Sequence, residues 1–184
     1  MLTLGITGTL GAGKGTVVEY LVSQKKFKHF SVSEYLTQEL TNLGIPINRD
    51  SMREIANEIR TKKGPDYITK ILFEKASICG SNAIIESIRN PKEAEFIKLN
   101  GGYLFAVDAD QKTRYKRVSA RGSLKDSVSF EEFQLQEEKE SKNTDPNAQN
   151  LNKCILLSDY KFDNNGTTAE LYKKVEDVIQ KIRN

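Results

Sequence analysis

The sequence predicts an α/β fold of three layers, in which a parallel five-stranded sheet lies between two layers of helices. Short apolar segments alternate along the chain with segments whose apolar residues recur at helical spacing, and this alternation is typical of parallel sheets covered on both faces. A glycine-rich loop follows the first apolar segment directly, at residues 8–15. The length of 184 residues, with 38% hydrophobic residues, suits a single domain over residues 1–184.

Five segments are expected to be strands because they are short and apolar and are bounded by turn-forming residues. They are residues 2–7, 29–32, 82–87, 101–110 and 159–166, the last of which includes a turn.

The expected helices have apolar residues that recur on one side. They are residues 14–23, 34–40, 51–60, 66–78, a helix opened by Pro91, and residues 111–121, 130–140 and 168–182. The first of them is expected to turn four residues inward: Val17, Val18, Leu21 and Val22. Ser33 stands where a residue would cap the second helix, and a proline in the first helical turn removes no intrahelical hydrogen bond. Residues 141–150 are expected to form a loop.

The composition excludes several classes of protein. A net charge of +3 is too small for the concentrated basic face of a nucleic-acid-binding protein. Cys79, Cys154 and the one histidine, His29, have no zinc-site spacing. We interpret the cysteines as reduced, semi-buried apolar residues and the histidine as structural. No stretch approaches the ~20 apolar residues of a membrane span, and the first residues lack the basic segment of a signal peptide. We therefore expect a cytoplasmic monomer or homodimer without nucleic-acid or membrane partners.

The loop "GTLGAGKG" fits the phosphate-binding pattern GxxxxGK through Gly8, Gly13 and Lys14. Glycine lets the backbone wrap a phosphate with its N–H groups facing inward, and lysine adds a mobile positive charge. The helix expected after the loop adds its N-terminal partial charge. The residues expected to bind the nucleotide here are Gly8, Gly11, Ala12, Gly13, Lys14, Gly15 and Thr16.

The ending "GKGT" of this loop resembles adenylate kinase and the related nucleoside monophosphate kinases. In those enzymes the metal ion is held more by phosphates and waters than by the loop. Gly15 stands where phosphate loops usually have Ser or Thr, so Thr16 is the hydroxyl residue available. The resemblance implies ATP and Mg²⁺ as cofactors, with Thr16 and Glu86 as the candidate metal ligands.

The segment "NAIIESIRNPKE" is an apolar strand that ends in Glu86 and resembles a Walker-B strand, in which a carboxylate orients magnesium or its waters. Arg89 falls where the related kinases place an arginine on the phosphate of the acceptor. The alternative is a strand-end glutamate and a surface arginine in a local ion pair.

The segment "KHFSVSEYLTQEL" resembles the start of the acceptor-binding helices in adenylate-kinase-like enzymes, which implies that residues 33–80 bind the acceptor. Ser33 would lie near the acceptor, or it would simply cap the helix. The arginine that such enzymes often have in this helix is replaced by Thr37. Arg49 and Arg53 are therefore the candidate cations for the acceptor phosphate.

The segment "TRYKRVSARGSLKD" contains Arg114, Arg117 and Arg121. Arg117 and Arg121 are four residues apart, so they share one helical face and can converge on an anion. The alternative is a solvated basic face. In nucleotide kinases and dephospho-CoA kinase an RxxxR helix opens the lid, and its arginines neutralise the transferring phosphoryl group. The resemblance implies a mobile lid over residues 114–150.

The segment "DYKFDNNGTTAELYKKVEDVI" resembles the end of dephospho-CoA kinase, where the backbone lies against the adenine of ATP. Asn165 and Gly166 are the candidate base contacts, and a simple turn with a helix cap is the alternative.

The order of segments from residue 1 to about residue 183 resembles the P-loop kinase superfamily. The chain is most similar to an archaeal and bacterial family that resembles both dephospho-CoA kinase and the nucleoside monophosphate kinases. The resemblance implies ATP-dependent phosphoryl transfer to a small phosphorylated nucleoside-type acceptor, with Lys14, Glu86, Arg117 and Arg121 as catalytic residues. The alternatives are a dephospho-CoA kinase and, from another class, a nucleotide-binding regulatory module without kinase turnover.

Overall fold

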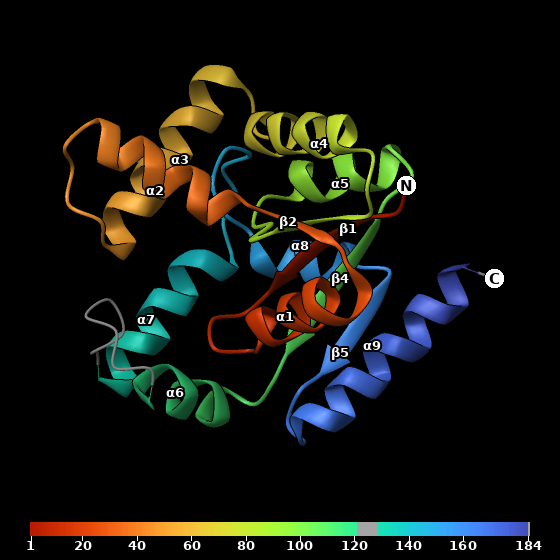
Figure 1. Cartoon of the computed structure of the whole chain (residues 1–184). Coiled ribbons are helices and arrows are strands. Elements are labelled where there is room, and N and C mark those ends of the chain that lie inside the picture. The colour runs from red at the N-terminus through yellow and green to blue at the C-terminus, as the bar shows by residue number, and fades with distance from the viewer. Residues whose placement is uncertain (121–128, 184) are drawn as a thin grey trace.

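The computed structural model describes residues 1–120 and 129–183. In this part of the chain five parallel strands form one sheet in the order β2-β3-β1-β4-β5 (Figure 1). The strands are β1 (Thr3–Gly8), β2 (Lys28–Ser31), β3 (Ala83–Glu86), β4 (Tyr103–Asp108) and β5 (Tyr160–Asp163). The central strand β1 leads directly into the glycine-rich loop, so the loop lies at the carboxyl edge of the sheet, between the ends of β3 and β4.

Helices connect the strands and cover both faces of the sheet. They are α1 (Lys14–Lys25), α2 (Val32–Asn42), α3 (Arg49–Lys63), α4 (Tyr67–Cys79), α5 (Pro91–Leu99), α6 (Gln111–Ala120), α7 (Phe130–Ser141), α8 (Leu151–Leu157) and α9 (Thr168–Arg183). Within residues 1–120 and 129–183, no helix is both long and apolar enough to cross a membrane.

The core consists of two clusters, one on each face of the sheet. Ile84 and Phe105 pack with residues of α1 and α9, whereas Ile85 and Leu104 pack with residues of α2, α3, α4 and α5. Successive side chains of a strand point to opposite faces, so neighbouring residues enter different clusters. The predicted arrangement of three layers with five parallel strands is confirmed.

Three local predictions were wrong. The cap of α2 is Ser31, whose side chain accepts a hydrogen bond from the backbone N–H of Glu34, so Ser33 lies inside the helix. Val22 is 38% exposed instead of buried, because α1 turns only Val17, Val18 and Leu21 into the core.

The third difference is helix α8, which the sequence did not predict. Asn150 caps it by accepting a hydrogen bond from the backbone N–H of Lys153, and Leu151 and Cys154 are buried. The burial of these two residues stabilises a short helix, which could not be predicted from the sequence because the polar residues 141–150 directly before it indicate a loop.

Candidate functional site

The loop between β1 and α1 has a backbone conformation that glycine adopts easily. Gly8 has a φ of 137° and Gly11 a φ of 77°. A Cβ atom at Gly8 would lie 2.0 Å from the carbonyl oxygen of Val107, and one at Gly11 would lie 2.5 Å from that of Arg114. The loop therefore packs backbone against backbone beside α6 (Figure 1), with no side chain at these positions to obstruct a bound phosphate.

Lys14 is the first residue of α1, and its side chain folds back over the loop. Its Nζ lies 2.9 Å from the carbonyl oxygen of Gly8 and 2.9 Å from that of Thr9. The ammonium group is therefore held over the loop, near the N-terminus of α1. Its positive charge and the partial positive charge of the helix N-terminus both favour a bound anion. A Cβ atom at Gly15 would meet no described atom within 4 Å, and Thr16 is half-buried. This cradle fits the phosphates of a nucleotide.

Glu86 ends β3 next to the loop and faces polar groups from the neighbouring strand. The Ser31 hydroxyl donates to Glu86 Oε2 at 3.3 Å, and His29 Nε2 lies 3.9 Å from the same oxygen. Burial raises the pKa of Glu86, but the nearby His29 and the charge of Lys14 outweigh it and lower the pKa below its ordinary value. Glu86 is therefore ionised at neutral pH and available to a cation.

The sequence interpretation of His29 as merely structural missed its place beside Glu86. The parallel register pairs Ser31 with Glu86 and His29 with Ile84, two residues earlier. Alternate residues of a strand lie on one face, so the register brings the imidazole and the carboxylate together. The available signal was the polar residue Ser31 at the end of β2, but only the order of the strands in the sheet places β2 beside Glu86.

The four residues expected to bind the acceptor line one pocket. Its lining comprises Ser33, Arg49, Arg53, Arg89, Arg60, Asn48, Ser87, Glu140, Gln149 and the apolar residues Leu10, Val32, Leu36 and Met52. Leu10 belongs to the phosphate loop and Ser87 follows Glu86, so the pocket adjoins the loop. Its walls combine guanidinium groups with an apolar surface.

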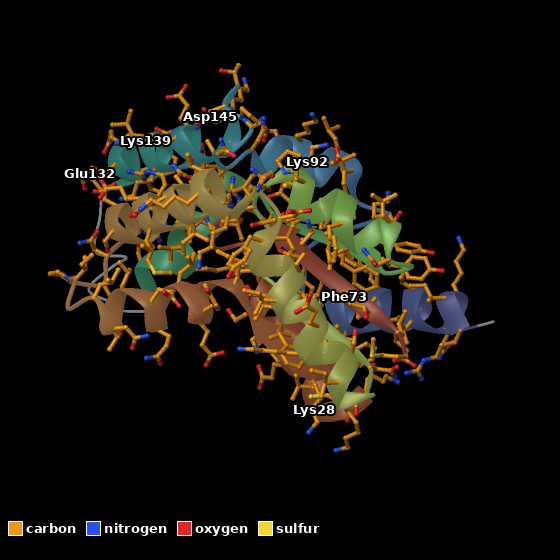
Figure 2. All side chains as sticks on the ribbon, turned by 90° about the horizontal axis from the view of Figure 1, so that it is seen from above. Lys28, Phe73, Lys92, Glu132, Lys139 and Asp145 are labelled. Carbon is orange, nitrogen blue, oxygen red and sulfur yellow. The ribbon has the colours of Figure 1, made fainter. Side chains whose placement is uncertain are left out.

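Arg89 is held by residues that lie after α6 in the chain. It forms an ion pair with Glu140 of α7, and its Nη1 donates to Gln149 Oε1 at 3.3 Å. The alternative of an ion pair between Arg89 and the strand-end Glu86 is not what the structure contains, since the carboxylate bound to Arg89 belongs to α7. Figure 2 shows Glu132 and Lys139 at the outer side of α7, where both are exposed, whereas Glu140 of the same helix is buried.

Sequence reasoning missed Arg60, which is 1% exposed. Its Nε and Nη2 donate to Glu93 Oε1 at 3.1 and 3.0 Å. Glu93 Oε2 accepts the backbone N–H groups of Arg89 at 2.9 Å and of Asn90 at 3.0 Å. The available signal was a charged residue on the apolar face of "EIANEIR", where a buried partner is required.

Arg117 approaches the end of β5 instead of open solvent. Its Nη2 donates to the carbonyl oxygen of Asn164 at 2.9 Å, and its buried Nη1 has no hydrogen-bond partner within residues 1–120 and 129–183. Arg121 lies outside the described residues, so its predicted convergence with Arg117 stays a prediction.

Arg114 is the best-anchored arginine of α6. Its Nε donates to the carbonyl oxygen of Ala109 at 2.7 Å and its Nη1 to that of Leu10 at 3.3 Å. It also forms an ion pair with Glu137 of α7. Arg114 therefore fastens the phosphate loop, α6 and α7 together.

Asn164, the residue before the predicted base contact Asn165, contacts the phosphate loop. The buried Asn164 side chain donates to the carbonyl oxygen of Ala12 at 2.8 Å. Asn165 is exposed, and its side-chain oxygen accepts the backbone N–H of Asp110 at 2.8 Å. Gly166 is also exposed, and a Cβ atom there would meet the carboxylate of Glu170. The base contacts proposed for Asn165 and Gly166 stay predictions.

Comparisons with known proteins agree with this architecture over the whole chain. The chain is 27% identical over 188 residues to UPF0200 protein MMP1282 of Methanococcus maripaludis, covering 100% of this chain and 99% of the relative. The solved structure of TT1252 from Thermus thermophilus has a TM-score of 0.67 at 17% identity, covering 98% of this chain and 97% of the other. Shikimate kinase from Acinetobacter baumannii, solved in complex with shikimate, has a TM-score of 0.60 at 16% identity and covers 98% and 94%. A gluconokinase from Sinorhizobium meliloti 1021 has a TM-score of 0.59 at 12% identity and covers 98% and 93%.

These structures share the fold with the chain, and the predicted P-loop kinase-like fold is thereby confirmed. A family model described as an AAA domain (AAA_18) matches residues 4–146, which include the phosphate loop, Glu86 and the residues that line the neighbouring pocket except Gln149. The match extends over well more than half of the sequence, and the chain therefore belongs to this AAA domain family.

Proposed function

We propose that this protein transfers the γ-phosphoryl group of ATP to a small phosphorylated acceptor of the nucleoside monophosphate type. One observation carries the proposal: an arginine-lined pocket adjoins the phosphate loop and contains Ser33, Arg49, Arg53 and Arg89. A kinase must hold two phosphate-bearing molecules side by side, and this arrangement provides two adjacent anion-binding surfaces.

On the donor side, Lys14 and the loop N–H groups bind and orient the phosphates of ATP. Glu86 is ionised and lies close enough to Lys14 to feel its charge. Glu86 and Thr16 are the residues that would hold Mg²⁺, directly or through water. A bound Mg²⁺ ion would neutralise negative charge on the phosphates.

On the acceptor side, Arg89 neutralises the phosphate of the acceptor together with Arg49 or Arg53. The apolar wall formed by Leu36 and Met52 contacts the uncharged part of the acceptor molecule. Arg117, with Arg121, neutralises the charge that spreads over the transferring oxygens. The protein supplies positioning and charge, and it needs no covalent intermediate.

A dephospho-CoA kinase would phosphorylate a hydroxyl group, which requires a base to accept the proton. Among the described residues that line the pocket, Glu140 is the one with a carboxylate that could act as this base, and it forms an ion pair with Arg89. A monophosphate acceptor is ionised at neutral pH and needs no base. The lining of the pocket therefore favours the monophosphate over the hydroxyl acceptor.

The test is ADP formation from ATP and Mg²⁺ with a panel of acceptors: the common nucleoside monophosphates, dephospho-CoA, shikimate and gluconate. Acceleration by a monophosphate is the expected result. Turnover with dephospho-CoA, shikimate or gluconate alone would refute the monophosphate acceptor. Tight ATP binding without acceleration by any acceptor would favour a regulatory module.

The matched variants are Lys14→Met and Lys92→Met. Lys14→Met removes the charge over the phosphate loop and is expected to lower kcat about 100- to 1000-fold. Lys92 is a surface residue of α5 that pairs with Glu95, so its variant should behave as the wild type. Equal activity of the two variants would refute the assignment of the donor site.

A further inference from the structure

Arg60 supplies a buried hydrogen-bond donor beside the phosphate loop. The residue lines the pocket that adjoins the loop, and its Nη1 has no hydrogen-bond partner within the described part of the chain. The residue is 1% exposed, so bulk water does not solvate the group. A buried guanidinium nitrogen left unpaired costs free energy, and a bound anion would remove that cost.

Glu93 cannot satisfy this nitrogen because both of its carboxylate oxygens are occupied. Oε1 accepts from Nε and Nη2 of Arg60, and Oε2 accepts the backbone N–H groups of Arg89 and Asn90. The same carboxylate therefore fixes the Arg60 side chain and the Arg89 backbone relative to each other. This connection joins α3 to the segment that precedes α5 and preorganises two arginines that line one pocket.

We propose that Arg60 and Arg89 together form a clamp for the phosphate monoester of the acceptor, with Arg60 as its fixed half. Guanidinium groups bind phosphate oxygens through charge-assisted, often bidentate hydrogen bonds. Arg60 is buried and held by Glu93, and its Nη1 has no partner among the described residues. Arg89 binds Glu140 and exchanges that carboxylate for the phosphate. The clamp deepens the proposed function and rests on it for the identity of the ligand.

Glu140 then occupies the position of an anion until the acceptor arrives. Its side chain is 9% exposed and its carboxylate pairs with Arg89, as an acceptor phosphate would. A dianionic phosphate attracts the two guanidinium groups more strongly than a single carboxylate does, so exchange favours the acceptor.

The first test uses inorganic phosphate as the probe, with the phosphate loop filled by a non-hydrolysable ATP analogue and Mg²⁺. Calorimetry compares the wild type with Arg60→Lys, which keeps a positive charge beside Glu93 but lacks the guanidinium fork. Phosphate affinity is expected to fall about tenfold to a hundredfold, while affinity for the ATP analogue stays the same. Lys62→Met, on the exposed side of α3, is the control and should match the wild type. Equal phosphate affinity in wild type and Arg60→Lys would overturn the clamp.

Two measurements avoid the risk that Arg60→Lys disturbs folding. Glu140→Gln leaves the buried ion pair between Arg60 and Glu93 intact and removes the negative charge that competes with phosphate for Arg89, so phosphate affinity should rise severalfold. Unchanged or weaker phosphate binding would contradict the exchange at Arg89. Crystals of the wild type grown with phosphate and the ATP analogue should place a phosphate oxygen within hydrogen-bond distance of Arg60 Nη1. Phosphate bound elsewhere in the pocket would overturn the role of Arg60.

The outcomes separate this inference from the proposed function. Phosphate binding that depends on Arg60, without turnover of any acceptor, would refute the kinase proposal and retain the clamp. Turnover of a monophosphate with the same KM in wild type and Arg60→Lys would retain the kinase and refute the clamp.

Discussion

Replacing Asn164 by alanine tests how β5 supports the phosphate loop. The buried Nδ2 donates to the carbonyl oxygen of Ala12 at 2.8 Å, and Ala12 itself has no exposed surface. The backbone N–H of Asn164 donates to Asp108 at 2.8 Å, and its carbonyl oxygen accepts from Arg117 at 2.9 Å. An alanine retains both backbone contacts, so Asn164→Ala removes only the side-chain hydrogen bond.

The loss leaves the carbonyl group of Ala12 buried without this donor, which costs about 1–3 kcal/mol in the free energy of unfolding. For a chain of this size, each kcal/mol lowers Tm by about 2–4 °C. Urea denaturation followed by circular dichroism measures the change. Titration with an ATP analogue should also show weaker binding, because the loop is held less firmly.

Asn165→Ala is the matched comparison, since Asn165 is adjacent in sequence but exposed. Its loss should change the free energy of unfolding by no more than about 0.5 kcal/mol. If Asn165 contacts the nucleotide base, its variant weakens ATP binding while stability is retained. A stability loss at Asn165→Ala equal to or larger than that at Asn164→Ala would refute this reasoning.

Three further predictions concern the fold. Gly11→Ala should cost more than about 1 kcal/mol in urea denaturation, because its φ of 77° is strained for alanine and its Cβ would lie 2.5 Å from a carbonyl oxygen of α6; unchanged stability would contradict the close packing. Exposed Cys79 should react with a thiol reagent in the native protein, whereas burial raises the pKa of Cys154 and protects it until unfolding; two reactive thiols in the native state would contradict this. The hydrogen bond from Lys25 is the main cause that lowers the pKa of Glu176 to about 2, so the stability advantage of wild type over Glu176→Gln is present above pH 4.5 and is lost as the pH falls toward 2; denaturation curves with an advantage unaltered across that range would contradict the pairing.

The sheet could be predicted because its signals are local. Each strand is a short apolar run, and parallel strands joined by helices place their carboxyl ends at one edge. The glycine loop after β1 and Glu86 at the end of β3 were therefore expected on the same edge. The positions of helix ends are harder to predict because single contacts decide them: the hydroxyl of Ser31 accepts from the backbone N–H of Glu34, so the cap of α2 lies two residues before the predicted cap Ser33.

The less predictable parts of the site depend on packing between distant segments. Arg60 meets Glu93 only because α3 lies near the start of α5, and no spacing in the sequence encodes that distance. Asn164 and Asn165 are the two residues that directly follow β5, and adjacent residues at the end of a strand point in different directions. Sequence composition cannot choose between them, whereas the burial of Asn164 against Ala12 does.

Helix α7 connects the phosphate loop and the neighbouring pocket through two carboxylates three residues apart. Glu137 pairs with Arg114, which also donates to the carbonyl oxygen of Leu10 in the phosphate loop, while Glu140 pairs with Arg89 in the neighbouring pocket. Residues three apart lie on the same helical face, so one face of α7 meets both arginines. An anion that takes Glu140's place on Arg89 releases one of these attachments and leaves the other intact. The position of α7 is then energetically coupled to the binding of an anion in this pocket, while its attachment to the phosphate loop persists.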